Sequence, residues 1–67
     1  MEIGLRLAER VRTLRRAKGW SQEELAHRAG MHRTFISQVE RNVKNATVQS
    51  AERIAKALDV TMGELLD

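Results

Sequence analysis

The 67-residue sequence contains no cysteine and no proline, and it has only two aromatic residues, Trp20 and Phe35. Without cysteine, neither disulfides nor thiolate metal ligands can support the core of a chain this short, which buries only about 60% of its unfolded surface. The lack of proline, together with abundant Ala, Leu, Arg, Glu and Gln, favours helices throughout. With so few aromatic residues, the core must be mainly aliphatic.

Long hydrophobic runs are also missing, and no charged and apolar leader opens the sequence. We therefore expect a cytoplasmic protein that does not contact a membrane and folds as one domain over residues 1–67. Charge is unevenly distributed: residues 1–20 hold six basic and two acidic residues, whereas residues 45–67 hold two basic and four acidic ones. Such polarity allows one side of the molecule to face phosphate, although surface helices also carry many arginines without any such partner.

The first helix is predicted from Leu7, Val11 and Leu14, which recur at the spacing of one helical face. It should end near Gly19. Trp20 follows directly and precedes a helix-capping residue, which favours a hydrophobic plug between two helices over a role in stacking on bases.

The segment from Gln22 to Arg41 predicts two short amphipathic helices joined at Gly30, where a left-handed residue can end one helix before the next begins. Ser21 can cap the first of them, with Glu24 completing a capping box. The apolar positions at helical spacing are Leu25, Ala26, Ala29, Ile36 and Val39. This layout is typical of a DNA-binding helix-turn-helix.

Two further helices are predicted after a polar turn at residues 42–46, in which Asn42 suits a left-handed helix end. Thr47 can cap the fourth helix, and Thr61 with Glu64 forms a second capping box that opens the fifth. The inner face of the fourth helix should comprise Val48, Ala51, Ile54, Ala55 and Leu58. The sequence thus predicts an all-α fold of five helices.

With these motifs in view, the chain resembles the Cro/repressor-like (XRE-type) helix-turn-helix transcriptional regulators. The resemblance covers Leu7 to Leu66. It includes Leu14-Arg15, Ser21-Gln22-Glu23-Glu24-Leu25-Ala26, Ala29-Gly30, Ile36-Ser37, Glu40-Arg41 and the segment from Ile54 to Leu58. The segment from His32 to Ser37, followed by Glu40 to Asn42, is similar to controller proteins of restriction–modification systems. The family more often has Gly at position 42 and Ser or Thr at position 32, where His caps a helix poorly.

The resemblance implies a compact lambda-repressor-like domain whose second and third helices form the helix-turn-helix. It implies a bacterial or phage transcriptional regulator that binds a palindromic double-stranded operator as a homodimer, with the helix from about Arg33 to Glu40 in the major groove. Arg33, Thr34 and Gln38 would read bases, while Phe35 would either do so or pack between helices. Contacts to the DNA backbone would come from Gln22, Ser37, Arg41, Lys44 and Asn45.

Two further sets of residues receive roles from the family. Arg15 and Glu40 would form a structural salt bridge between the first helix and the recognition helix. Such a pair orients more than it stabilises, because burial offsets much of its attraction. Four apolar residues near the acidic end are candidates for the dimer interface or for closure of the monomer core: Val60, Met62, Leu65 and Leu66.

Other functions find little support in the sequence. His27 and His32 lack an obvious third ligand, so we expect no metal site, and we expect no cofactor or small-molecule ligand either. No nucleophile–base motif predicts an enzyme. The main alternative is a protein-interaction module of the antitoxin type with secondary DNA binding. Such chains usually carry an additional partner-neutralising tail, which favours the regulator here.

Overall fold

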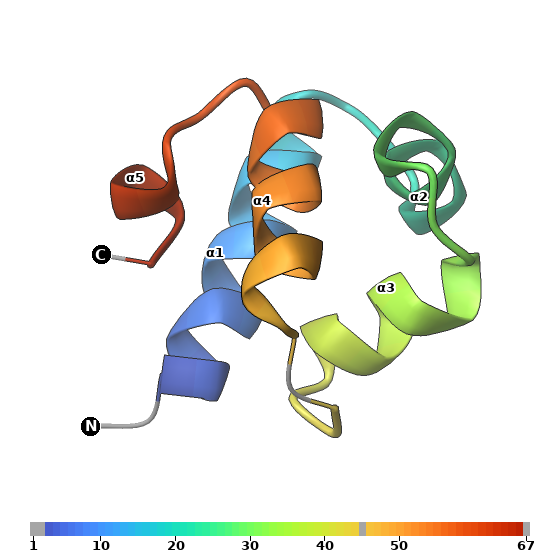
Figure 1. Ribbon diagram of the computed structural model, residues 1–67. Coiled ribbons are helices and arrows are strands. Elements are labelled where there is room, and N and C mark those ends of the chain that lie inside the picture. Colours follow the sequence, from blue (N-terminus) through green and yellow to red (C-terminus); the bar gives the residue numbers. More distant parts are fainter. Residues whose placement is uncertain (1–2, 45, 67) are drawn as a thin grey trace.

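The computed structural model describes residues 3–44 and 46–66. Over these ranges it contains five α-helices and no strand, as predicted: α1 (Ile3–Ala17), α2 (Gln22–Ala29), α3 (Arg33–Glu40), α4 (Val48–Ala57) and α5 (Met62–Leu66). Figure 1 shows α2 and α3 on one side of α1 and α4, with α5 on the opposite side. None of the described helices combines the length and apolar character needed to cross a membrane.

The core lies where these helices meet and is mainly aliphatic, as predicted. Its buried members come from all five helices and from the turn after α4: Leu7, Val11, Leu25, Ala26, Ile36, Val39, Ala51, Ile54, Ala55, Leu58 and Leu65. The two aromatic residues are only partly buried and pack against the edge of this cluster. The core therefore depends on interlocking of small and branched side chains from every helix.

Trp20 occupies the junction between α1 and α2, where its ring also faces two cations. The guanidinium carbon of Arg28 lies 4.3 Å from the ring centroid, and Lys18 Nζ lies 5.2 Å from it. The predicted hydrophobic plug is thus half-buried and covered by charged side chains on its outer side.

The first four helices end in the same way, with one left-handed residue followed by a hydrogen bond back into the last turn. The left-handed residues are Gly19, Gly30, Asn42 and Asp59, with φ between 57° and 73°. The returning bonds run from Trp20 N to Arg15 O, from Met31 N to Ala26 O, from Val43 N to Gln38 O and from Val60 N to Ala55 O. Asn42 therefore ends α3 in the left-handed conformation, as predicted from the sequence.

The two predicted capping boxes form to different extents. At the start of α2, Ser21 Oγ accepts from the Glu24 main-chain N–H at 3.0 Å, but the Glu24 carboxylate binds Arg28 at 2.7 Å. The second bond predicted for that box, from the Ser21 main-chain N–H to the Glu24 carboxylate, is therefore wrong. Arg28, one helical turn further along α2, binds this carboxylate instead. At α5 the box is complete, since Thr61 Oγ1 accepts from Glu64 N–H and Glu64 accepts from Thr61 N–H.

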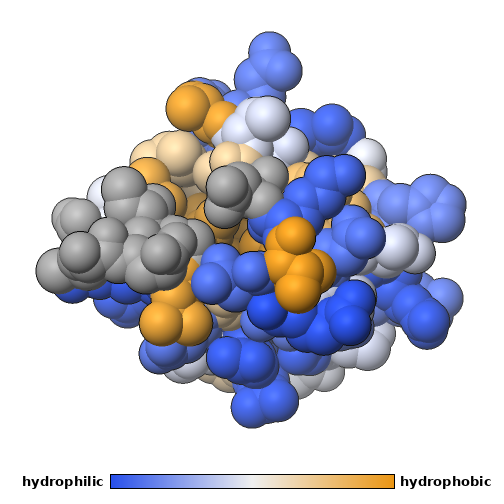
Figure 2. Space-filling view, turned by 90° about the horizontal axis from the view of Figure 1, so that it is seen from below, coloured by the Kyte–Doolittle hydropathy of each residue, from blue (hydrophilic) through white to orange (hydrophobic). Residues whose placement is uncertain are grey.

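One predicted core residue lies at the surface. Thr47 caps α4 by accepting from Ser50 N–H at 3.1 Å, as expected, but Val48, the first residue of that helix, is 69% exposed. Val48 lies outside the core cluster, at the N-terminal end of α4 and next to the turn that joins α3 to α4. Figure 2 shows mostly hydrophilic side chains over the right and lower parts of the face seen from below, and hydrophobic ones grouped mainly toward the upper left.

Candidate nucleic-acid interface

The turn between α2 and α3 is short and closed by main-chain hydrogen bonds. Gly30 N donates to His27 O at 3.2 Å and Met31 N donates to Ala26 O at 2.8 Å. Gly30 has φ +67°, a conformation that most other residues adopt only with strain. Buried side chains from α2 and α3 meet behind this turn, so the two helices form one packed unit.

Helix α3 has one buried face and one polar face. Ile36, Val39 and Glu40 are buried. Arg33 and Thr34 are exposed, and Ser37 and Gln38 are partly exposed. The polar face therefore offers a guanidinium, two hydroxyls and an amide to solvent along two turns of helix.

Phe35 differs from the other candidate base readers. It is half-buried and packs against the core cluster. Its ring thus supports the position of α3, which favours the packing alternative of the two that its place in the sequence left open.

A buried ion pair joins α1 to the end of α3. Arg15 Nε lies 2.7 Å from Glu40 Oε2, and Arg15 Nη2 lies 2.9 Å from Glu40 Oε1. The third nitrogen, Nη1, donates to Trp20 O at 2.8 Å. Hydrogen bonding to Glu40 raises the pKa of Arg15, which favours the charged guanidinium in this pair. This is the pairing that the family resemblance implies.

Gln22 extends this network to the start of α2. Its Nε2 donates to Glu40 Oε1 at 3.1 Å, so the carboxylate receives bonds from both α1 and α2. Arg12 adds a further bond from α1, to the Glu40 main-chain carbonyl at 3.4 Å. Sequence reasoning assigned Gln22 to a DNA phosphate and did not foresee its bond to Glu40. No local pattern indicates this bond, because Gln22 and Glu40 lie 18 positions apart in the sequence and meet only when α2 and α3 pack together.

At the other end of α3, His32 occupies the capping position without a side-chain hydrogen bond to the helix. Its main-chain carbonyl accepts from Phe35 N and Ile36 N. His32 and Arg33 are both exposed here. The first N–H groups of α3 therefore lack a capping side chain, and this end of the helix favours an anion.

The remaining candidates for backbone contact lie at the opposite end of α3 and in the turn that follows. Arg41 and Lys44 are exposed, and Arg41 Nε donates to Ser37 O at 3.4 Å. Ser37 and Gln22 are partly exposed. Asn45 lies outside the described residues.

The four candidate interface residues of the C-terminal region do not share one environment. Leu65 is completely buried and belongs to the core cluster. Of the two roles that the sequence left open for Leu65, its burial supports closure of the monomer core, where α5 packs against α1 and α4. Val60, Met62 and Leu66 are partly exposed, and Val60 and Met62 line a groove between α4 and α5.

Comparison with known proteins connects this geometry to a family. The Helix-turn-helix family HTH_3 matches residues 11–65. The chain belongs to this family. Control protein C.SmaI of Serratia marcescens is 44% identical over 66 residues, which cover 98% of the chain and 79% of the relative.

Solved structures agree with this membership. The crystal structure of the hypothetical transcription factor NHTF from Neisseria has a TM-score of 0.95 and 42% identity, over 98% of the chain and 76% of NHTF. A crystal structure of SinR in complex with DNA has a TM-score of 0.86 and 37% identity, covering 91% of the chain and 98% of that structure. Among sequence relatives, SinR of Bacillus subtilis (strain 168) is longer, and the match spans 56% of it. The five-helix HTH_3 domain is thus shared with proteins named as transcription factors and controllers.

Proposed function

We propose that the chain is a sequence-specific regulator of transcription that binds double-stranded DNA with α3 in the major groove. The observation that carries this proposal is the two-sided nature of α3. Its rear face is buried and tied to α1 and α2, while its front face presents polar side chains to solvent. The likeness to SinR, whose DNA complex has the same domain, supports it.

Base reading falls to the front of α3. Arg33 is exposed in its first turn and can form two hydrogen bonds to guanine O6 and N7. Thr34 beside it can offer its methyl group to thymine or its hydroxyl to a base. Gln38 lies one turn further along and is suited to adenine. Phe35 would make at most a minor contact with a base, because its ring packs against the core.

Backbone contacts would fix the register of α3 without reading sequence. Ser37, Arg41 and Lys44 lie at one end of the polar face and in the turn after it. Gln22 can serve both the ion pair and the DNA, since its amide nitrogen has two protons and only one is needed for Glu40. The second proton can bind a phosphate at the start of α2. Asn45 keeps its proposed backbone role from the sequence alone.

The active form we propose is a homodimer on a palindromic operator. One helix of eight residues covers only a few base pairs, so two copies would supply both affinity and specificity. The domain measures 29 Å in its longest dimension, and half-sites one helical turn apart are separated by about 34 Å. Two copies can therefore lie side by side, with Val60, Met62 and Leu66 as the candidate contact residues. Such a regulator would act on DNA in a bacterial cytoplasm.

The proposal is tested by selecting binding sites from a library of random duplexes in a mobility-shift assay. Enrichment of one palindromic sequence over bulk DNA at rising salt is the expected result, since base contacts survive where phosphate contacts weaken. Retention of random duplexes without enrichment of any sequence would contradict it.

A further inference from the structure

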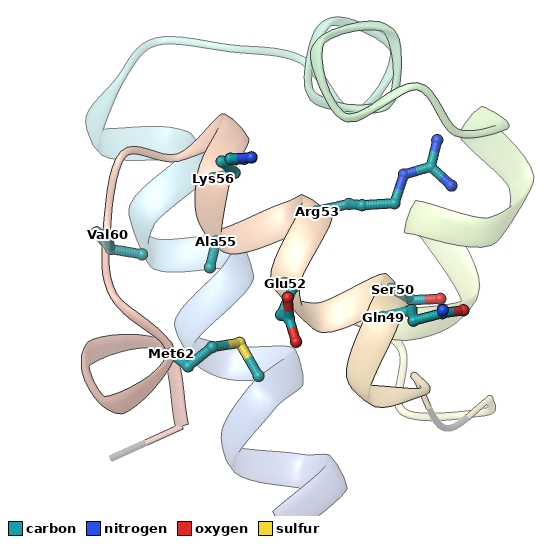
Figure 3. Close-up of a pocket in the computed structure, with 8 residues that line it drawn as sticks. All are labelled: Gln49, Ser50, Glu52, Arg53, Ala55, Lys56, Val60 and Met62. Atoms are coloured by element: carbon teal, nitrogen blue, oxygen red, sulfur yellow. The ribbon is translucent and has the colours of Figure 1, made fainter.

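Arg53 on α4 contacts the turn of the helix-turn-helix, although neither the sequence pattern nor the proposed function assigns it a role. Its Nη2 donates to the Gly30 main-chain oxygen at 2.6 Å, across 23 residues of sequence. Figure 3 shows the Arg53 side chain extending from α4 toward the segment that joins α2 and α3. The bond therefore links α4 to the pair of helices, α2 and α3, that we propose to bind DNA.

The position of this bond has a physical explanation. Gly30 follows the last residue of α2, where carbonyl groups lack partners within the helix and carry its partial negative charge. A guanidinium provides a charge-assisted hydrogen bond at this end. Glycine is favoured here because its φ is +67°. A Cβ at this position would lie 2.7 Å from Arg53 Nη2, so a larger residue would also displace the guanidinium from the carbonyl.

With this contact, side chains from other helices bind α3 at its last residue and also bind the turn that precedes its first residue. At its C-terminal end, Arg15 and Gln22 bind the Glu40 side chain. At its N-terminal end, Arg53 binds the Gly30 carbonyl, three residues before Arg33 opens the helix. The angle at which α3 leaves the turn thus depends on α4 as well as on the packing of α2.

We infer that Arg53 is a positioning residue for DNA recognition, acting through the Gly30 carbonyl on the orientation of α3. The inference rests on the proposed function, because orientation matters only if α3 reads bases. Hydrogen bonds to base edges form only when the helix has one position and orientation in the groove. Contacts to phosphates tolerate a wider range of helix orientations, because long flexible side chains can adjust. Loss of the Arg53 bond therefore reduces specific binding more than non-specific binding.

The test compares Arg53→Ala with Lys56→Ala, which removes the same charge from an exposed position on the same helix. Dissociation constants are measured for a duplex selected by the unmodified protein and for a random duplex, each at several salt concentrations. The bond is exposed to solvent, so Arg53→Ala is expected to weaken binding to the selected duplex by up to about fivefold. Binding to the random duplex should fall no further than in Lys56→Ala, and Arg53→Lys should recover part of the loss.

The salt dependence separates this role from direct phosphate contact. If Arg53 only positions α3, the slope of log K against log salt should be the same in Arg53→Ala as in Lys56→Ala. If Arg53 binds a phosphate, the magnitude of the slope in Arg53→Ala should be smaller by about 0.9. Equal losses on both duplexes with that smaller slope would overturn the inference. So would an unchanged affinity for the selected duplex.

A measurement without DNA tests the structural premise of the inference, that the Arg53 bond holds the turn, separately from the proposed function. In the free protein, Arg53→Ala should shift the amide NMR signals of Gly30, Met31 and His32, while Lys56→Ala should leave them in place. Unmoved signals in a folded Arg53→Ala variant would show that the bond does not hold the turn. Failure of the unmodified protein to select any sequence would instead count against the proposed function.

Discussion

Arg15 and Glu40 form a buried two-bond ion pair, with 2.7 Å between Nε and Oε2 and 2.9 Å between Nη2 and Oε1. The pair joins α1 to the last residue of α3 across 25 positions of sequence. Because Gln22 and Trp20 also bind this pair, it fixes α3 relative to the junction of α1 and α2.

Removing one partner of this pair should be more harmful than replacing both. Arg15→Ala or Glu40→Ala leaves a buried group without its partner and should cost about 3–5 kcal/mol of unfolding free energy. The double variant Arg15→Met with Glu40→Met should recover much of that loss, because no uncompensated charge remains. Urea unfolding of the three variants measures the difference.

The exposed pair Arg28–Glu24 provides a matched control. It has the same 2.7 Å separation, but its side chains are 50% and 42% exposed. Arg28→Ala should therefore cost no more than about 2 kcal/mol, including its contact with Trp20. Equal losses from Arg15→Ala and Arg28→Ala would contradict the structural role of the buried pair.

Arg33→Ala should weaken binding to the selected operator by about 1–3 kcal/mol and relax the preference at one or two base pairs. The reason is the loss of a two-bond contact with a guanine edge. Arg10→Ala, the control, removes the same charge from an exposed position of α1 to which no DNA contact is assigned. Site selection with both variants measures the effect, and an unchanged preferred sequence in Arg33→Ala would show that another residue reads those positions.

Lys44→Ala should behave differently, because Lys44 is proposed to bind phosphate. Its affinity should fall alike for all sequences, and the slope of log K against log salt should decrease by about 0.9. Fluorescence-anisotropy titrations over a range of salt concentrations provide the measurement. A loss confined to the selected operator would assign Lys44 to base reading instead.

The helices were predictable because their signals are local. Apolar spacing, the caps at Ser21, Thr47 and Thr61 and the left-handed residues Gly30 and Asn42 each act within a few positions. Val48 was misplaced because periodicity identifies a helix face but does not reveal where that face extends past its neighbours. Glu24 was misassigned because Arg28 competes for its carboxylate one turn along the helix.

The candidate site was predictable only in part. The two faces of α3 follow from its own residues, and the Arg15–Glu40 pairing came from the family resemblance. The bonds of Gln22 to Glu40 and of Arg53 to Gly30 depend on how helices distant in sequence pack. Leu65 shows the same limit, since an apolar residue in a final short helix can face either its own core or a partner.

Acid should weaken the attachment of α5 through Glu64. Bonds from the Thr61 main chain and hydroxyl lower the pKa of Glu64 below its usual value of 4.5, so folding favours the charged carboxylate. This contribution to stability is present above pH 4.5 and is lost as the pH falls through the lowered pKa. Glu64→Gln should therefore show a weaker dependence of thermal stability on pH across this window. An identical pH profile would show that the capping box does not contribute.

The two sides of α5 should respond differently to substitution. Leu65→Ala removes a fully buried side chain and should lower the unfolding free energy by about 2–5 kcal/mol. Met62→Asp should leave the monomer folded and shift it away from dimer in sedimentation, because it places a charge in the proposed interface. Val48→Asp, at an exposed position, is the control. Unchanged association in Met62→Asp would exclude this surface as the interface.

Amide NMR signals recorded during titration with a selected operator duplex test the placement of α3 most directly. The largest changes should fall on residues 33–41 and on Gln22. The same titration with a random duplex should shift the backbone-contact residues and leave Arg33 and Thr34 closer to their free positions. Changes centred on α4 and the groove beside α5, with α3 unaffected, would contradict recognition of DNA by this helix.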